Sequence, residues 1–402
     1  MPKTDKRYLD DPYTMSFRAR VHSSAPAEGG IDVILEQSYF YPESGGQLAD
    51  AGTIAGLRVV DVQERGEDAV VHRVALEGSV AAPDGEVDCA IEWERRFDHM
   101  QQHTGQHVLS RAFIETGGRE TVSFHMGEDA CTIDLDGAAL DEDGARAAEA
   151  LANRVIEENR AVRVRTVAVS ELAEESLRRK LPEGVREVRL VEVADFDTCG
   201  CCGTHVRATG ELQLVKVLKW EKAKGTTRVT FKAGRRALAD YNEKHDLAQE
   251  LANRFTTAIS EVAGKVDRLV AEGQTGRKAL ARASERLAGF ERDALLASAR
   301  VCGGVRVVAR VLEEGDGAYA RALSSAIQAA GGAVAVLGAR DGTVLCAASK
   351  GVAVDFTDAI AWARGDGGSG GGKGPFAQIR LAPGGDVAAF VTRVGGYVEE
   401  QL

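Results

Sequence analysis

The sequence predicts an α+β protein built from several domains, and three observations support this. Short β segments fill residues 15–92, apolar residues take a helical spacing from Glu94, and a charged, proline-free stretch covers 236–299. A chain of 402 residues also exceeds the usual size of one domain. We therefore expect an N-terminal β-barrel domain over 1–92, an α+β domain over 93–236, a helical stalk or linker over 237–300 and a C-terminal α/β domain over 301–402.

The N-terminal domain is predicted from five short β segments, and a small sandwich is the alternative to a barrel. The segments cover 17–23, 31–37, 56–64, 69–76 and 86–93 and are separated by clusters of Gly, Pro and Asp. Between the second and third lies SYFYPESGGQLADAG, where Gly45 and Gly46 would let the backbone approach a ligand and Gln47 offers a donor and acceptors. Most such turns only connect strands, so this segment alone is weak evidence of a site.

The central domain is predicted to open with a long helix. Residues 94–115 place Phe97, Met100, Val108, Leu109 and Phe113 on one face. A second helix over 142–160, strands over 162–169 and 185–193, and a β-hairpin over 212–234 that turns at Lys224-Gly225 complete an α+β pattern. The domain is expected to close near Arg236.

The C-terminal region is predicted to begin with helix and continue as an α/β domain. Alternating charge over 236–299 is typical of an exposed helix or helical hairpin. Beyond it, strands over 305–312, 333–339 and 343–349 alternate with helices around 319–330 and 356–363.

A glycine-rich loop is expected over 365–378. Gly367, Gly372 and Lys373 nearly spell a phosphate-binding P-loop, but Gly374 replaces the Ser or Thr that would hold Mg²⁺, and Pro375 opposes a helix there. A connector is therefore favoured over an ATPase site.

Composition excludes several classes of protein. A formal charge of −11 argues against binding nucleic acid over the whole surface, so any RNA contact must be local, as in the basic stretch 216–236. That stretch is equally well explained as a solvated hairpin face. With no signal peptide or membrane span, and seven cysteines that suit metal or thiol chemistry better than disulfides, we expect a protein of the reducing cytoplasm.

Four residues have the chemistry and spacing of a zinc site. His103 and His107 lie one helical turn apart, and Cys201-Cys-Gly-Thr-His205 adds a thiolate and a third imidazole around a turn in which we expect Gly203 to adopt a positive φ. The zinc is either catalytic or a closed structural site. Cys199 and Cys202 form a second possible ligand pair that competes with Cys201.

The motifs FYPESGGQLADAG, RFDHMQQHTGQHVLS and CGCCGTHV resemble the editing domain of alanyl-tRNA synthetases and the freestanding alanyl-tRNA editing proteins, over residues 10–236. The helical stretch and the C-terminal domain resemble the tail of the same synthetases. The resemblance places the zinc ligands at His103, His107, Cys201 and His205, and the substrate-binding segment at Gly45, Gly46 and Gln47. Ser38 stands where the family commonly has Thr, and its hydroxyl is expected to contact a serine side chain.

The resemblance implies zinc-dependent, ATP-independent hydrolysis in trans of mischarged tRNA, Ser-tRNA(Ala) and possibly Gly-tRNA(Ala). The catalytic group is then a water molecule that zinc activates, either as a fifth ligand of the ion or without binding it directly. No side chain is assigned as a general base, and His125 is not included in the site. No aminoacylation core precedes the barrel, so the chain is not expected to charge tRNA. The expected partners are tRNA and a second copy bound through the stalk and the C-terminal domain, with no membrane. The expected tRNA contacts are Lys216, Lys219, Lys222, Lys224 and Lys373.

Two alternatives remain open at this point. One is a non-catalytic tRNA-binding protein with a structural zinc. The other is a phosphatase or exonuclease, against which the absence of an Asp-His-His motif argues.

Overall fold

The structure is a computed structural model that describes residues 2–66, 68–75, 81–137, 140–172, 177–178, 184 and 186–402. Its helices and sheets confirm the predicted α+β class. The chain divides into two compact units, Met1–Glu250 and Leu251–Leu402. The finer division into four domains stays a prediction. Residues 76 and 185, at the ends of two predicted strands, lie outside the described residues. Among the described residues, no helix is long and apolar enough to cross a membrane.

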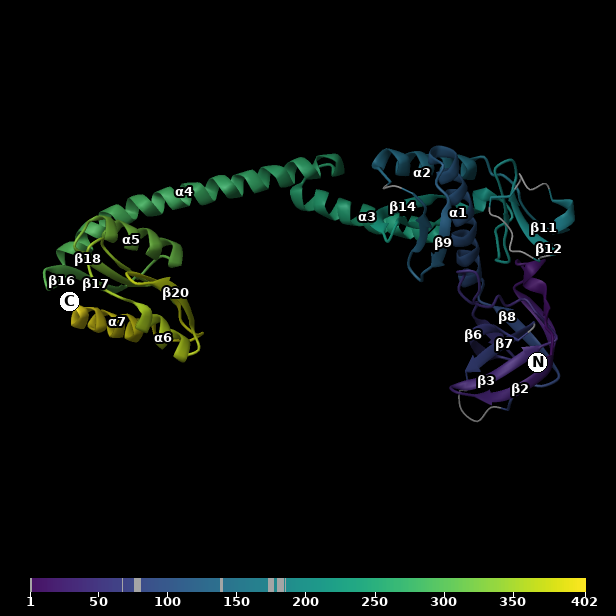
Figure 1. The fold of residues 1–402 in the computed structure, drawn as a ribbon, viewed down its shortest axis with the longest axis horizontal. Helices are drawn as coiled ribbons and strands as arrows, with labels where there is room; N and C mark the ends of the chain where they lie inside the picture. The colour runs from purple at the N-terminus through teal and green to yellow at the C-terminus, as the bar shows by residue number, and fades with distance from the viewer. Residues whose placement is uncertain are drawn as a thin grey trace. The chain divides into compact units, whose positions relative to one another are not determined.

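Six strands of the first unit form a closed barrel (Figure 1). Alternate Val and Ile side chains fill its interior, which is the reason the segments read as strands. The predicted segments lie in five of the strands, and the sixth, β5, is only three residues long. In barrel order the strands are β2 (Ser16–Ala27), β3 (Gly30–Leu35), β7 (Ala69–Ala75), β6 (Leu57–Arg65), β5 (Gly52–Ile54) and β8 (Glu86–Ile91). Beside them, β1 (Asp5–Lys6) pairs in parallel with β4 (Gln37–Ser38), and η1 (Arg7–Leu9) follows β1.

The long helix α1 (Trp93–Gly117) is the element around which the rest of the first unit packs. The sequence predicted one apolar face, but all side chains from His99 to Ser110 are buried. This enclosure arises because α2 (Glu142–Glu157), strands β9, β10, β13 and β15, and η4 (Thr209–Leu212) all contact it. Polar residues on every side of α1 therefore lie in the interior and need partners there.

Two antiparallel sheets complete the first unit. The four-stranded sheet has the order β14 (Val215–Ala223), β15 (Thr226–Ala233), β10 (Cys131–Leu135), β9 (Thr121–Met126). The three-stranded sheet has the order β11 (Val162–Ala168), β12 (Glu187–Val193), β13 (Asp197–Gly200), and η2 (Val169–Glu171) follows β11. The predicted hairpin is confirmed, with its turn at Lys224-Gly225.

The stretch predicted to be helical is helical. It contains α3 (Gly234–Phe255), η5 (Ile259–Glu261) and α4 (Val262–Ala297). The boundary between the two units falls within α3.

The rest of the second unit is a six-stranded mixed sheet with α5 (Gly317–Ala329), α6 (Thr357–Gly365) and α7 (Val387–Gln401) packed against it. Its order is β16 (Arg300–Cys302), β17 (Val305–Val311), β18 (Ala333–Gly338), β19 (Thr343–Ala348), β21 (Phe376–Arg380), β20 (Ser369–Lys373). The expectation of a glycine-rich loop was wrong, because residues 369–373 form the edge strand β20. Backbone pairing with β21 needs no side chains, and at Gly372 a Cβ would lie 2.1 Å from the Phe376 carbonyl oxygen.

Candidate functional site

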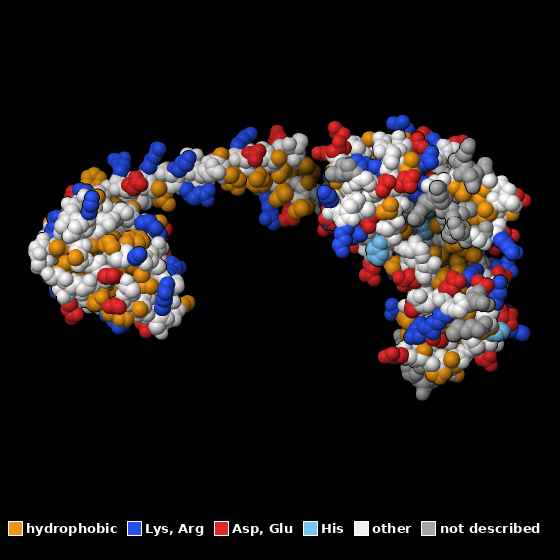
Figure 2. Space-filling model, in the orientation of Figure 1, with side chains coloured by type: hydrophobic (Ala, Val, Ile, Leu, Met, Phe, Trp, Pro, Cys, Tyr) orange, Lys and Arg blue, Asp and Glu red, His pale blue; other side chains and the backbone are white. Residues whose placement is uncertain are grey.

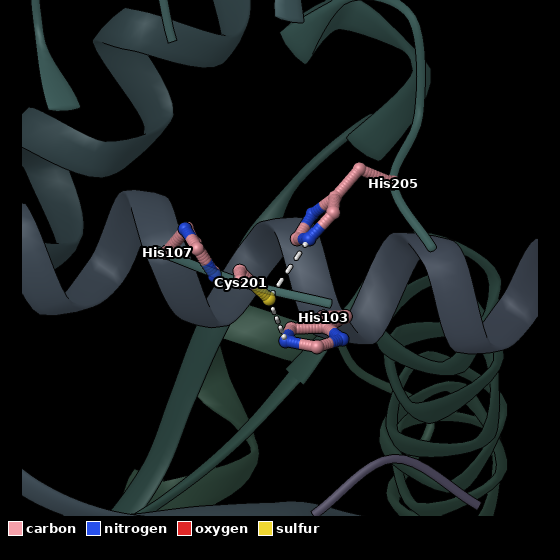
Figure 3. Close-up of side chains that lie close together, drawn as sticks. All are labelled: His103, His107, Cys201 and His205. Carbon is pink, nitrogen blue, oxygen red and sulfur yellow. Dashed lines mark hydrogen bonds between the residues drawn. The ribbon is translucent and has the colours of Figure 1, made fainter. Parts of the chain in front are cut away.

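Two separate stretches of the first unit bring four possible metal ligands together (Figure 3). His103 and His107 come from consecutive turns of α1, Cys201 directly follows β13, and His205 lies in the loop before η4. One donor atom from each residue lies within 4.8 Å of the other three. The spacing of four in α1 produces this convergence because it places both imidazoles on one side of the helix.

The Cys201 thiol lies close to two of the imidazoles. Its Sγ is 3.3 Å from His103 Nε2 and 3.4 Å from His205 Nε2, and it also accepts a hydrogen bond from the Gly203 amide at 3.3 Å. Ligand atoms around a tetrahedral zinc lie about 3.3 to 3.8 Å apart, as bond lengths of about 2.0 to 2.3 Å require. The two sulfur–nitrogen distances match the size of a zinc site.

The outward-facing nitrogen of each imidazole meets an oxygen. His103 Nδ1 donates to Gln47 Oε1 at 2.8 Å, and His205 Nδ1 lies 3.1 Å from Thr104 Oγ1. His107 Nδ1 lies 3.5 Å from Asp197 Oδ2. The Gln47 oxygen leaves the Nε2 lone pair of His103 free for a metal, and Nε2 of both His103 and His205 faces the Cys201 sulfur, as expected of metal-ligating histidines.

Burial sets the protonation of this group. It is the main cause that holds the pKa of His103 and His205 well below the usual value, and neighbouring imidazoles add to the effect. The same burial raises the pKa of the Cys201 thiol to about 12. Burial also opposes ionisation of Asp197, but His107 and Arg178 outweigh it and lower the pKa of that carboxyl. His103 and His205 are thus neutral, as metal binding requires, and the Cys201 thiol must lose its proton to a metal.

The loop that carries Cys201 is held by a buried arginine and by a glycine. Arg189 donates to the carbonyl oxygens of Cys201 and Gly203 at 2.7 and 3.0 Å. A positive φ was expected at Gly203 and is not found. Glycine is needed there for space, because a Cβ would lie 2.1 Å from Cε1 of His103.

The competing thiols lie outside the group. Cys199 is buried in β13 and Cys202 is exposed, while Cys201 is the thiol among the three imidazoles. His125 is exposed on β9 and is likewise not part of the group.

The glycine-rich segment of the barrel lies against the site. Gln47 is fully buried: its oxygen also accepts from the Thr204 amide at 3.1 Å, and its nitrogen donates to Thr204 Oγ1 at 2.8 Å. The Gly46 carbonyl accepts a hydrogen bond from the Met126 amide of β9, while a Cβ at Gly45 would meet nothing within 4 Å. The segment therefore contacts His103 directly and leaves the Gly45 side open.

Ser38 is fully buried beside the barrel strand β7, with its hydroxyl already bonded. It accepts from the Phe40 amide at 3.1 Å and lies 2.7 Å from His72 Nε2. Because His72 Nδ1 donates to the Val33 carbonyl, Nε2 is the acceptor and Ser38 the donor. Burial lowers the pKa of His72 to about 4, so this tautomer persists at neutral pH, and one lone pair of Ser38 remains.

Two of the five lysines predicted to contact tRNA form ion pairs with glutamates. Lys216 pairs with Glu149 at 2.6 Å and Lys219 with Glu221 at 3.7 Å. The other three, Lys222, Lys224 and Lys373, are exposed, on β14, in the hairpin turn and on β20. None of the five belongs to the histidine and cysteine group.

Four residues that support the ligands were not predicted from the sequence. They are Thr104, Arg178, Arg189 and Asp197, and Arg178 pairs with Asp197 at 2.9 Å. Thr104 adjoins His103, and Asp197 lies four residues before Cys201, so proximity to the motifs could have pointed to these two. The two arginines stand farther from the motifs, and no signal in the sequence marks them.

Two family models match this chain, one over the barrel and one over the segment that carries Cys201 and His205. A family model for the threonyl and alanyl tRNA synthetase second additional domain matches residues 188–230, which include Cys201 and His205. A model for class II (A) tRNA synthetases matches residues 14–95, which form the barrel and carry Gly45, Gly46 and Gln47.

Individual relatives are similar to longer stretches of the chain. The alanyl-tRNA editing protein Aarsd1 of Danio rerio is 34% identical over 275 residues, which are 64% of this chain and 66% of that protein. The alanyl-tRNA editing protein AlaX-L of Pyrococcus horikoshii is 31% identical over 247 residues, 60% of each chain. The chain belongs to the family of the alanyl-tRNA editing proteins. An alanine–tRNA ligase from Ignicoccus hospitalis is 33% identical over 398 residues, 94% of this chain but 41% of the ligase. The chain thus spans about two thirds or less of the length of these relatives.

Proposed function

We propose that this member of the editing family hydrolyses the ester bond between a wrongly attached amino acid and tRNA, in trans and with zinc as its cofactor. The observation that carries the proposal is the group of His103, His107, Cys201 and His205, whose donor atoms lie within 4.8 Å of one another. Thiolate and imidazole are the ligands that zinc prefers. The oxygen partners of the imidazoles and the close fit of Gly203 against His103 support a site shaped for an ion.

The four residues would hold the ion, and the remaining chain would orient the substrate. When bound, zinc supplies Lewis acidity that polarises an ester carbonyl and acidifies water. Gln47 holds His103 in the ligating tautomer, and one of its amide hydrogens is not used in the bonds to Thr204. That hydrogen and the backbone at Gly45 and Gly46 are the proposed substrate contacts.

Gln47→Leu is expected to lower zinc affinity about 10- to 100-fold, because the partner that orients His103 is lost. Competition with a chromogenic chelator measures the change. Gln37→Leu serves as a matched control, since its side-chain amide donates to the Arg18 carbonyl at the barrel surface, away from the histidine and cysteine group. An unchanged zinc affinity in Gln47→Leu would remove Gln47 from the support of the site.

For selectivity, we propose Ser-tRNA(Ala), and possibly Gly-tRNA(Ala), as substrates, with Ala-tRNA(Ala) largely spared. Ser38 is the proposed discriminating residue because its remaining lone pair can accept from a serine hydroxyl, which alanine lacks. A site that pairs with a substrate hydroxyl rejects the analogue without it, since its own polar group is then unsatisfied.

Ser38→Val should therefore slow release of serine about 10- to 100-fold and narrow the gap between serine and alanine. Parallel deacylation time courses on both charged tRNAs measure this, and the time course of the native chain also tests the proposed activity. Ser38→Thr is the matched control because it keeps the hydroxyl. Equal native rates for serine and alanine would contradict the selectivity, and an unchanged ratio in Ser38→Val would exclude Ser38.

A non-catalytic tRNA-binding protein with a structural zinc is the second candidate. It is favoured by one observation, that all four donors of the group come from the protein, as in closed structural sites. Zinc-loaded protein that binds tRNA(Ala) without releasing serine would select this candidate.

We propose tRNA contacts at Lys222, Lys224 and Lys373, and weaker ones at Lys216 and Lys219, whose charges are paired with Glu149 and Glu221. We also propose a homodimer that forms through the helical region and the C-terminal domain.

A further inference from the structure

Phe124 of β9 is an aromatic side chain that lies against the histidine and cysteine group. The centre of its ring is 5.5 Å from that of His103, and the two ring planes are inclined by only 29°. The ring also adjoins the glycine-rich segment, since a Cβ at Gly46 would lie 3.1 Å from Phe124 Cδ1. None of the substrate contacts proposed above uses this ring.

Strand β9 is an edge strand of its sheet, and the turn of the glycine-rich segment lies along its outer edge. The Met126 amide donates to the Gly46 carbonyl across this edge at 3.0 Å. Gly45 and Gly46 are both exposed. A substrate that is held by the backbone of this turn would therefore lie beside β9.

The face of β9 that carries Phe124 is otherwise turned to the core. On this face Met126 is fully buried, and Thr121 is buried and donates to Ser110 of α1 at 2.7 Å. All three residues of this face pair with residues of β10 that belong to the core. Phe124 lies between the other two, yet its side chain stays partly exposed. Solvent thus reaches the inner face of β9 beside His103.

Exposure alone does not mark Phe124 as a binding residue. Figure 2 shows hydrophobic side chains exposed between charged ones on the first unit, which is usual for a folded protein. The distinguishing feature is the position of the ring. It stacks on a proposed metal ligand and adjoins the turn that is proposed to hold the substrate.

We propose that Phe124 is the platform on which the adenine base at the 3′ end of tRNA stacks. This inference rests on the proposed function, in which the ester joins the amino acid to the ribose of that adenosine. One face of the ring is turned to His103, so the base would stack on the other face. At a contact distance of about 3.5 Å, the base would lie about 9 Å from the centre of the His103 ring. A ribose and an ester linkage span that gap, which places the ester at the histidine and cysteine group.

The chemistry of the ring suits a nucleobase better than the amino acid. Aromatic side chains bind unpaired bases by stacking, and every base offers a flat π face. The small polar side chain of serine gains little from an apolar ring, and its proposed contact is Ser38 of β4. Stacking of this kind recognises the terminal adenosine and reads nothing of the acceptor stem.

A seryl-adenosine analogue with an amide in place of the ester tests the proposal by binding alone. Calorimetry with the zinc-loaded full chain measures its Kd. Phe124→Leu keeps an apolar side chain but removes the π face, so the Kd should rise about 10- to 100-fold. Phe124→Tyr keeps that face and should stay within about threefold of the native Kd. Phe97→Leu is the matched control, because Phe97 is a half-buried phenylalanine of α1 that packs on Trp93, and it should leave the Kd unchanged.

A second analogue without the base separates stacking from other roles of the ring. It is the same seryl amide on methyl riboside. The native chain and Phe124→Leu should bind it with equal Kd, because it has no base to stack. For the adenosine analogue, the NMR signals of adenine H2 and H8 should move upfield on binding to the native chain and to Phe124→Tyr. They should not move upfield with Phe124→Leu.

Three results would overturn the proposal. An unchanged Kd in Phe124→Leu would show that the ring does not bind the base. An equal loss of affinity for the analogue without the base would make the ring a wall of the amino-acid site. Loss of zinc from Phe124→Leu would make it a support of His103. Serine release from Ser-tRNA(Ala) by the native chain is measured separately, so hydrolysis can fail while stacking stands, and the reverse.

Discussion

Cys201→Ala should release zinc and abolish serine release from Ser-tRNA(Ala). Loss of an outer partner of a ligand already lowers metal affinity about 10- to 100-fold, so loss of a ligand should lower it more than about 100-fold. The rate of deacylation at limiting zinc should fall by at least the same factor. Elemental analysis of the purified variant and a deacylation time course measure the two effects.

The neighbouring thiols supply the matched controls. Cys199 and Cys202 lie outside the group of donor atoms, so Cys199→Ala and Cys202→Ala should retain zinc and activity. Full zinc occupancy in Cys201→Ala with loss in Cys199→Ala would show that the wrong thiolate was chosen. Loss of zinc with full hydrolysis would show that the metal is structural.

Arg96→Met should destabilise the first unit by about 3 to 5 kcal/mol, because it leaves the Asp50 carboxylate buried without its partner. Arg96 and Asp50 form an ion pair between α1 and the barrel with both side chains fully buried. Arg96 also donates to the carbonyl oxygens of Pro12 at 2.7 Å and Tyr39 at 2.5 Å. This one side chain thus joins the helix that carries two histidines to the segment that carries Gln47.

Urea denaturation followed by tryptophan fluorescence measures the loss. A Trp362→Phe background confines the signal to Trp93 and Trp220 of the first unit. Arg146→Met is the control, because its ion pair with Glu142 lies on the surface of α2 and should contribute nothing measurable. If Arg96→Met lowers the free energy of unfolding by less than about 1 kcal/mol, the ion pair does not hold α1 to the barrel.

Elements with a clear period were predicted well, and several short elements without one were not. The long helix over 94–115 and the hairpin over 212–234 have strong local patterns, and both are present as α1 and as β14 with β15. Strands β5, β9, β10 and β13 are three to six residues long and carry little periodicity of their own. Strand β20 consists mostly of glycine, so only its pairing with β21 defines it as a strand.

The sequence by itself determined the type of chemistry. Two histidines one helical turn apart and a Cys-x-x-x-His turn indicate possible metal ligands before any fold is known, because ligand type and local spacing are properties of the chain.

Only the tertiary structure decided how these residues are used. It brings Cys201 rather than Cys199 or Cys202 among the imidazoles, and it commits Gln47 to His103 and Thr204. It also encloses α1, whose side chains from His99 to Ser110 are all buried. The physical reason is that burial and hydrogen-bond partners depend on segments far apart in the chain, and no local pattern records which of them will meet.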